Sequence, residues 1–162
     1  MNRQRRRTRY DVTVERELGC YPPDARRAFL RDPVVWLPGK MTMHGASTFR
    51  SDLRLWGMAL DVEFRVGTPW TRGTSTTRRL QVEVVHPPLG AAWMLRPIDG
   101  DLTLLGEQRL RLRFEGAVTG ARARSLRRWS ARRMMRALLA GVAARLSMGA
   151  VSPPPPSSGT RR

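Results

Sequence analysis

The sequence predicts one α+β domain in which an antiparallel sheet packs against a long C-terminal helix. Three observations predict it. Apolar and polar residues alternate through much of residues 45–115, as they do in half-buried strands. The segments between these strands are short, which favours a meander over parallel strands joined by crossover helices. Residues 125–146 then change to apolar positions spaced i, i+3, i+4 and i+7, the pattern of an amphipathic helix.

Length and charge suggest that this domain lies between two polar tails. The chain has 162 residues and a net charge of +17, but residues 11–115 hold fifteen basic and thirteen acidic residues, so the excess charge lies at the ends. We expect a disordered basic tail over residues 1–8, the domain over 9–148 and a disordered proline-rich tail over 149–162. Twenty-nine of the thirty basic residues are arginine. GC-rich codon usage produces such a skew, so arginine abundance alone does not indicate an anionic partner.

The N-terminal part of the domain predicts one strand followed by two short helices. Residues 10–18 alternate, with Tyr10, Val12 and Val14 on the inner face. The segment "YPPDARRAFLRD" carries prolines at its start and an apolar stripe, which predicts a helix. The segment "PVVWLPG" that follows predicts a short apolar turn or a second helix.

Five further strands are expected before the long helix, at residues 47–56, 58–66, 74–85, 91–97 and 107–114. The segment "IDGD" at 98–101 is interpreted as a turn. The residues expected to face inward on the last four strands are Met58, Leu60, Val62, Phe64, Val66, Leu80, Val82, Val84, Trp93, Leu95, Leu110, Leu112 and Phe114.

The C-terminal helix is expected to begin near Ser125 and to bury an apolar stripe. Its arginines are expected largely off that stripe, so the segment is first a core helix and only second an anion-binding surface. Gly141 within it is expected to leave room for a ligand or for a crossing strand, of which the strand is favoured. The stripe consists of Ala131, Met135, Leu138, Leu139, Val142 and Leu146, and the off-stripe arginines are Arg127, Arg128, Arg132, Arg136 and Arg145.

The layout resembles the START-like, or SRPBCC, family of helix-grip domains, which includes polyketide aromatases/cyclases and small lipid-transport proteins. The matching segments are "PPDARRAFLRDPVVWLPG" after the first strand, the "VHPPLG" turn and the terminal helix, and the resemblance covers about residues 8–148. It implies a curved antiparallel sheet of about six or seven strands wrapped around the long helix, with an elongated apolar cavity between them.

In that topology the first and last strands are neighbours, and their charges are complementary. Opposite charges on paired strands contribute roughly 0.2–1 kcal/mol per pair. The outer faces would bring Asp11, Glu15 and Glu17 beside Arg109, Arg111 and Arg113.

Motifs for metal or covalent chemistry are not evident in the sequence. His44 and His86 are far apart, no G-x-S-x-G segment occurs, and "GKMT" at 39–42 lacks the pattern of a phosphate loop. We therefore expect no cofactor and no metal. Cys20 is the only cysteine, and no apolar run follows the charged start, so we expect a cytoplasmic protein.

The candidate site is the cavity wall that the resemblance implies, together with the helix arginines. Adaptable apolar walls suit irregular ligands. The polar candidates in the cavity are His44, Thr74 and Arg96, and the candidate anion contacts are Arg127, Arg128, Arg132 and Arg136. The cavity candidates are Trp36, His44, Leu60, Val62, Phe64, Val82, Val84, Trp93, Leu95, Leu112, Phe114, Met135, Leu138 and Val142.

Three functions stay open on this evidence. The first is binding or carriage of an apolar small molecule or lipid, and the second is an aromatase/cyclase-type enzyme acting on a similar ligand. The third is a basic adaptor whose ends contact an anionic membrane surface or nucleic acid. No catalytic set can be assigned, and the absence of a nucleic-acid reading motif disfavours nucleic acid. The oligomeric state is not determined.

Overall fold

The computed structural model of the protein describes residues 7–19, 22–43, 45–55, 57–92, 95–106 and 108–149. Its strands form one antiparallel sheet in the order β1-β8-β7-β6-β4-β3-β2, with β5 paired to β6. The helical elements are α1 (Pro22–Leu30), the 3-10 turn η1 (Pro33–Val35) and α2 (Ala121–Gly149). The strands are β1 (Thr8–Glu17), β2 (Thr42–Met43), β3 (Thr48–Leu55), β4 (Met58–Val66), β5 (Trp70–Arg72), β6 (Ser75–Val85), β7 (Ile98–Leu105) and β8 (Arg109–Val118).

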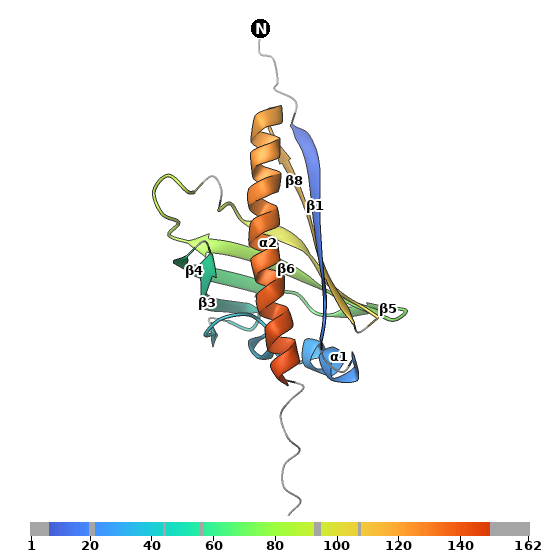
Figure 1. Ribbon diagram of the computed structural model, residues 1–162. Coiled ribbons are helices and arrows are strands. Elements are labelled where there is room, and N and C mark those ends of the chain that lie inside the picture. The colour runs from blue at the N-terminus through green and yellow to red at the C-terminus, as the bar shows by residue number, and fades with distance from the viewer. Residues whose placement is uncertain are drawn as a thin grey trace, which may run out of the picture.

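The sheet curves around α2, which lies against one of its faces (Figure 1). Strands β1 and β8 run alongside the helix and contact it, while β3, β4 and β6 extend across it. Helix α1 lies at the C-terminal end of α2 and contacts it. The predicted sheet-on-helix architecture is confirmed, with eight strands, of which β2 and β5 have only two and three residues. The second of the two short helices expected after β1 is the three-residue turn η1.

The predicted pairing of the first and last strands is confirmed over the whole length of β1. Glu15 lies opposite Arg111 and Glu17 opposite Arg109 in the register of β1 and β8. The Arg111 Nε is 2.6 Å from a Glu15 carboxylate oxygen, and Arg109 contacts both glutamates. These exposed pairs contribute little individually, but their charge pattern favours this register over its alternatives.

The third acidic residue of β1 does not follow this prediction. Asp11 lies opposite Glu115, whereas Thr13 lies opposite Arg113. Arg113 forms its ion pair with Glu115, at 2.9 Å. Antiparallel strands pair in reverse order, so the three arginines of β8 lie opposite Glu17, Glu15 and Thr13 in turn. The partner of Asp11 is the next outward residue of β8, Glu115.

The strand expected at residues 91–97 is wrong. Residues 91–92 form a turn, and the Leu95 N–H donates a hydrogen bond to the Ala91 carbonyl oxygen at 3.1 Å. Leu95 is buried as expected, and Trp93 lies outside the described residues. The strand instead begins at "IDGD", which the sequence interpretation made a turn.

Contacts with neighbouring strands explain why turn-forming residues begin β7. Asp99 and Asp101 alternate on its outer face, and Arg79 of β6 pairs with both, at 2.6 Å and 3.2 Å. Gly100 faces inward where β8 approaches closely, because a Cβ there would lie 2.3 Å from the Arg113 carbonyl oxygen. A strand that packs this tightly against its neighbour accepts only glycine at that position.

Helix α2 begins four residues earlier than predicted, at Ala121, and its predicted apolar stripe is confirmed as buried. Gly141 meets the Pro38 side chain, because a Cβ there would lie 2.5 Å from the Pro38 Cβ. The expectation of a crossing strand at Gly141 is therefore wrong, since the segment after η1 crosses the helix there. Met58 was expected inside but is 37% exposed at the start of β4.

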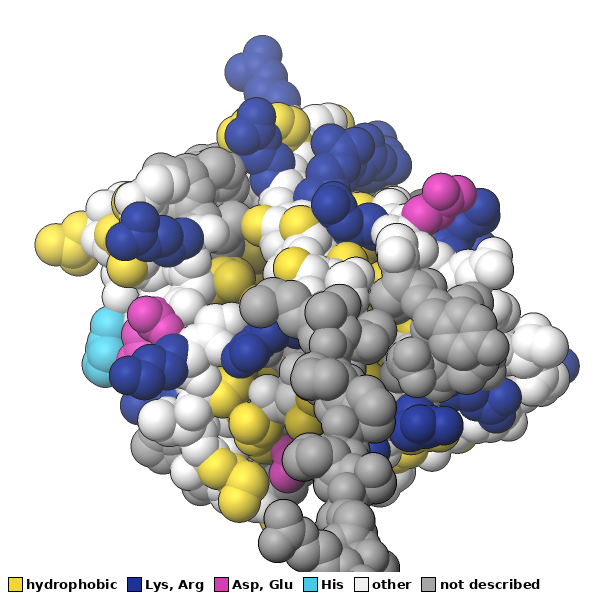
Figure 2. Space-filling view, turned by 60° about the horizontal axis from the view of Figure 1, so that its bottom comes forward, with side chains coloured by type: hydrophobic (Ala, Val, Ile, Leu, Met, Phe, Trp, Pro, Cys, Tyr) yellow, Lys and Arg dark blue, Asp and Glu magenta, His cyan; other side chains and the backbone are white. Residues whose placement is uncertain are grey.

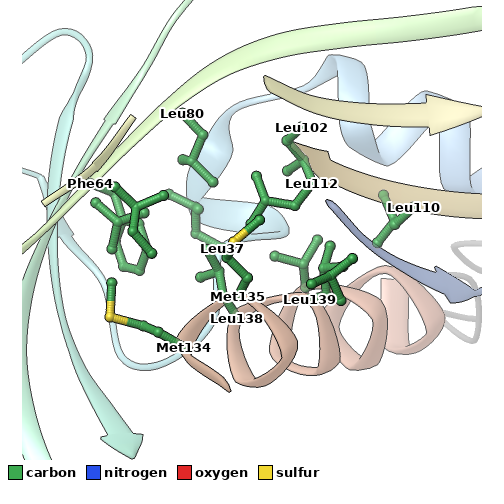
Figure 3. Packing of buried hydrophobic residues seen from close by; sticks show 14 of the residues in the cluster. Leu37, Phe64, Leu80, Leu102, Leu110, Leu112, Met134, Met135, Leu138 and Leu139 are labelled. Atoms are coloured by element: carbon green, nitrogen blue, oxygen red, sulfur yellow. The ribbon is translucent and has the colours of Figure 1, made fainter. Parts of the chain in front are cut away.

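The core lies between the concave face of the sheet and α2. Leu80, Leu102 and Leu112 extend from the sheet toward Met135 and Leu138 of the helix (Figure 3). All five side chains are almost completely buried. This packing fixes the position of α2 on the sheet and therefore positions every residue of the candidate site.

Candidate functional site

The interior between α2 and the sheet brings together most of the predicted cavity residues. Most come from β4, β6, β8 and α2. Alternate residues of these strands and one stripe of the helix face the same interior space. His44 and Trp93 lie outside the described residues. The other candidates are all buried: Trp36, Leu60, Val62, Phe64, Val82, Val84, Leu95, Leu112, Phe114, Met135, Leu138 and Val142.

Buried apolar side chains from the sheet and α2 pack against one another in this interior. Three hollows lined by described residues lie on the outer surface, and Val82 is the one candidate residue of the apolar wall that lines any of them. Thr74 and Arg96 are exposed, so the expectation that they reach the interior is wrong. The buried wall is consequently apolar apart from a small number of polar groups.

The indole of Trp36 is one of these polar groups. Trp36 is completely buried next to Phe29, with the ring centroids 5.1 Å apart. Its Nε1 has no hydrogen-bond partner among the described residues. A buried N–H without an acceptor is costly, so this donor is available to an oxygen atom that reaches it.

Arg78 of β6 is the second buried polar group. Its guanidinium donates hydrogen bonds to the carbonyl oxygens of Phe29 at 3.1 Å and Arg31 at 3.0 Å, and its Nε donates to Gly67 at 3.1 Å. It also lies 5.5 Å from the centroid of the Trp36 ring. Desolvation lowers the pKa of Arg78, and the carboxylate of Asp32 partly opposes that effect.

Strand alternation contains the signal for Arg78, which was not recognised. Residue 78 has the same parity as Leu80, Val82 and Val84, whose inward orientation was predicted. A lone arginine in such a series indicates a cation with acceptors inside the fold. The acceptors themselves come from α1 and the β4–β5 connection, which local periodicity does not reveal.

Arg127 of α2 corrects the prediction that this residue lies off the apolar stripe. It is buried, and its guanidinium donates hydrogen bonds to the carbonyl oxygens of Arg96 at 2.9 Å and Pro97 at 3.2 Å. Desolvation lowers its pKa, while Tyr10 raises it and Arg96 lowers it further. The other three anion-contact candidates, Arg128, Arg132 and Arg136, are exposed as expected.

A groove lies at the N-terminal end of α2, beside Arg127. Its volume is about 720 Å³. Its cationic lining consists of Arg7, Arg96 and Arg127, and its apolar lining includes Val118 and Leu126. Figure 2 brings the opposite end of the molecule forward, where dark-blue basic side chains are spread over the face among yellow apolar ones.

Two further classes of site were sought in the described residues. No group of three or more His, Cys, Asp or Glu side chains there is arranged to hold a metal ion. None of the helices described is long and apolar enough to cross a membrane.

Comparisons with known proteins bear on the fold. No family model and no curated protein matches the sequence. The solved structure of Ara h 8.0201 matches with a TM-score of 0.51 and 7% identity, over 86% of this chain and 98% of that one. A protein from Thermus thermophilus matches with a TM-score of 0.46 and 16% identity, over 88% of this chain and 100% of that one. The Aha1 dimer from Colwellia psychrerythraea matches with a TM-score of 0.40 and 16% identity, over 86% of this chain and 98% of that one.

Identities this low carry information about architecture alone. The match to Ara h 8.0201 extends over nearly all of that structure, and the sheet order and long helix described above account for it. The chain therefore has the helix-grip fold that the START-like resemblance implied.

Proposed function

We propose that the protein binds an apolar small molecule or lipid between α2 and the sheet. The helix-grip fold supports this, because it places an apolar sheet face opposite an apolar helix face. The observation that carries the proposal is the buried Trp36 Nε1, which has no acceptor among the described residues. An apolar ligand with one carbonyl or hydroxyl oxygen would pair with this donor and remove the cost of leaving it unpaired.

Binding requires that side chains in this interior change position. Met134 and Met135 of α2 are both buried there. Unbranched methionine side chains change rotamer readily and adapt to irregular shapes. The ligand would replace apolar contacts between α2 and the sheet with contacts of similar kind.

A neutral fluorescent probe tests whether the interior accepts a ligand. N-phenyl-1-naphthylamine carries no charge, so the arginines should contribute little to its binding. We expect saturable fluorescence enhancement that changes little between low and high salt, because apolar burial is not screened. Native mass spectrometry of freshly purified protein should also show a bound small molecule that denaturation releases.

The Trp36→Phe substitution tests the role of the indole donor. We expect 2-undecanone to displace the probe about 2- to 12-fold less effectively from this variant, since one hydrogen bond contributes about 0.5–1.5 kcal/mol. Undecane, which has no oxygen, should displace the probe equally from both proteins. Trp70→Phe is the matched control because Trp70 is 49% exposed on β5. Absence of probe binding to the unaltered protein, together with no released small molecule, would refute the proposed function.

A further inference from the structure

The arginines of the two faces of the molecule differ in their partners. Many of those on the outer face of the sheet form ion pairs with carboxylates, such as Arg79–Asp99 at 2.6 Å and Arg111–Glu15 at 2.6 Å. The exposed arginines of α2 form no ion pair within the described part of the chain. They are Arg122, Arg128, Arg132, Arg133 and Arg136.

The position of the acidic residues explains this difference. Residues 116–162 contain ten arginines and no acidic residue, so α2 cannot neutralise its own charge. The paired carboxylates belong to strands and face away from the helix on the opposite side of the sheet. The exposed face of α2 therefore has a positive potential that no carboxylate among the described residues neutralises by an ion pair, and an external anion would neutralise it.

Two large apolar side chains are exposed within this cationic face. Leu126 is 49% exposed and Trp129 is 50% exposed. Arg122, Leu126, Trp129, Arg133 and Arg136 follow the spacing i, i+4, i+7, i+11 and i+14, which places them on one line along the helix. We call these five residues the basic stripe. The Arg133 guanidinium lies 5.3 Å from the centroid of the Trp129 ring.

The groove at the start of α2 adjoins the basic stripe through Leu126, which belongs to both. Its arginines come from three separate segments, Arg7, Arg96 and Arg127, and no acidic residue is among its described lining. Val118 and Ala123 add apolar surface. A lining that combines cationic and apolar side chains matches a negatively charged headgroup joined to a hydrocarbon chain.

We propose that the basic stripe and the adjoining groove dock the protein on an anionic lipid surface. Arginines bind the negative potential of such a surface, and tryptophan and leucine favour the boundary between headgroups and hydrocarbon. Nucleic acid fits these observations less well, because leucine does not stack on bases and apolar side chains contribute to the groove lining. The proposal is independent of the interior ligand, since neither Leu126 nor Trp129 contributes to the core.

Vesicle binding tests the charge requirement. Full-length protein should sediment with phosphatidylcholine vesicles containing about 30% phosphatidylglycerol, much less with pure phosphatidylcholine, and less in each case as salt rises. Arg133→Gln combined with Arg136→Gln should weaken binding about 30-fold, because each arginine near an anionic surface contributes roughly a fivefold factor. Arg54→Gln combined with Arg72→Gln removes the same charge from exposed positions on β3 and β5. This control should weaken binding no more than about threefold.

The apolar requirement distinguishes a lipid surface from a general polyanion. Leu126→Ala combined with Trp129→Ala should weaken vesicle binding at least about tenfold, and Trp70→Ala, which truncates a similarly exposed tryptophan, should change it less than about twofold. Brominated lipids should quench tryptophan fluorescence, and Trp129→Phe should remove most of this quenching. The unfolding midpoint in urea should change little in all variants, because these side chains lie outside the buried core.

Three results would overturn the proposal. The first is equal binding of the protein to neutral and anionic vesicles. The second is an equal loss of vesicle binding in the basic-stripe variants and in their control variants. The third is binding of a mixed-sequence oligonucleotide, or of glycerol phosphate alone, by protein that does not sediment with anionic vesicles. Probe binding in the interior is measured separately on the same samples, so failure of the proposed function does not affect this outcome.

Discussion

At the scale of single residues, Arg78 connects the sheet to the end of α1. Its guanidinium reaches the carbonyl oxygens of Phe29 and Arg31, where α1 ends. The last carbonyls of a helix have no donor inside the helix and carry partial negative charge, so a cation there is favourable. Arg78 thereby satisfies acceptors that α1 cannot satisfy itself, and its own charge is held by carbonyl groups.

We expect Arg78→Ala to lower the free energy of unfolding by about 2–4 kcal/mol, because it leaves one buried and two partly buried carbonyl oxygens without this donor. Arg78→Lys should recover only part of this loss, since one ammonium group does not reproduce the planar fork of a guanidinium. Urea unfolding followed by circular dichroism measures both variants. Arg54→Ala, at an exposed position on β3, is the control and should change stability by less than about 0.5 kcal/mol. Similar losses at positions 78 and 54 would contradict the role assigned to Arg78.

At the scale of elements, α2 combines two surfaces with different requirements. Its buried side packs on β1, β8, α1 and η1, and its exposed side carries the basic stripe. Apolar burial of several side chains at about 1.5–3 kcal/mol each outweighs the weak repulsion among exposed arginines. The rotation of the helix is consequently determined by its apolar residues, and its arginines occupy the remaining surface.

The two faces should respond differently to truncation of a side chain. Leu138→Ala should destabilise the protein by about 2–5 kcal/mol, because it leaves a cavity between α2 and the sheet. Arg132→Ala should change stability by no more than about 0.5 kcal/mol, since its side chain is exposed. Thermal or urea unfolding of the two variants gives the comparison. Equal effects would mean that α2 is rotated relative to the orientation described here.

At the scale of the whole molecule, the chain closes through β1 and β8, which come from opposite ends of the domain sequence. Pairing continues from Thr8 with Val118 to Glu17 with Arg109. Tyr10 of β1 is buried and packs edge-on against Phe114 of β8, with ring centroids 5.9 Å apart. The N-terminal strand is therefore part of the core and not an accessory to it.

A truncated chain consisting of residues 7–149 should keep the full stability, because it contains all the strand pairings and the whole buried cluster. We expect its free energy of unfolding to lie within about 0.5 kcal/mol of the intact protein. A second truncation that begins at residue 13 is the control. It removes Tyr10 and Val12, both buried, and should lower stability by several kcal/mol. A large loss in the first truncation would show that the core extends beyond the described residues.

Local periodicity predicted most of the fold because it records which side of an element is apolar. The inward residues of β4 from Leu60 onward, those of β6 and β8, and the stripe of α2 were all identified in this way. Complementary charges also indicated that Glu15 and Glu17 lie beside Arg109 and Arg111. These features depend on residues close together in sequence or on simple pairing of opposite charges.

The candidate site was predicted less completely, because its polar groups depend on distant segments. Twelve of the cavity candidates are buried together, yet Arg78 was not identified and Arg127 was assigned to the wrong side of α2. Both arginines have carbonyl acceptors that come from other segments, at separations of 11 to 49 residues. Residue spacing contains no record of such partners.

By itself the sequence determined the antiparallel sheet, the long helix, the inner faces of β1, β4, β6, β8 and α2, and the separation of charge between the sheet and α2. Tertiary structure alone decided that β7 begins at Ile98, since Gly100 is required there by the close approach of the Arg113 carbonyl group. It also decided that Gly141 receives Pro38 and that three arginines from separate segments line one groove. The physical reason is the same in each case: backbone approach and burial of a cation depend on atoms that meet only when the chain has folded.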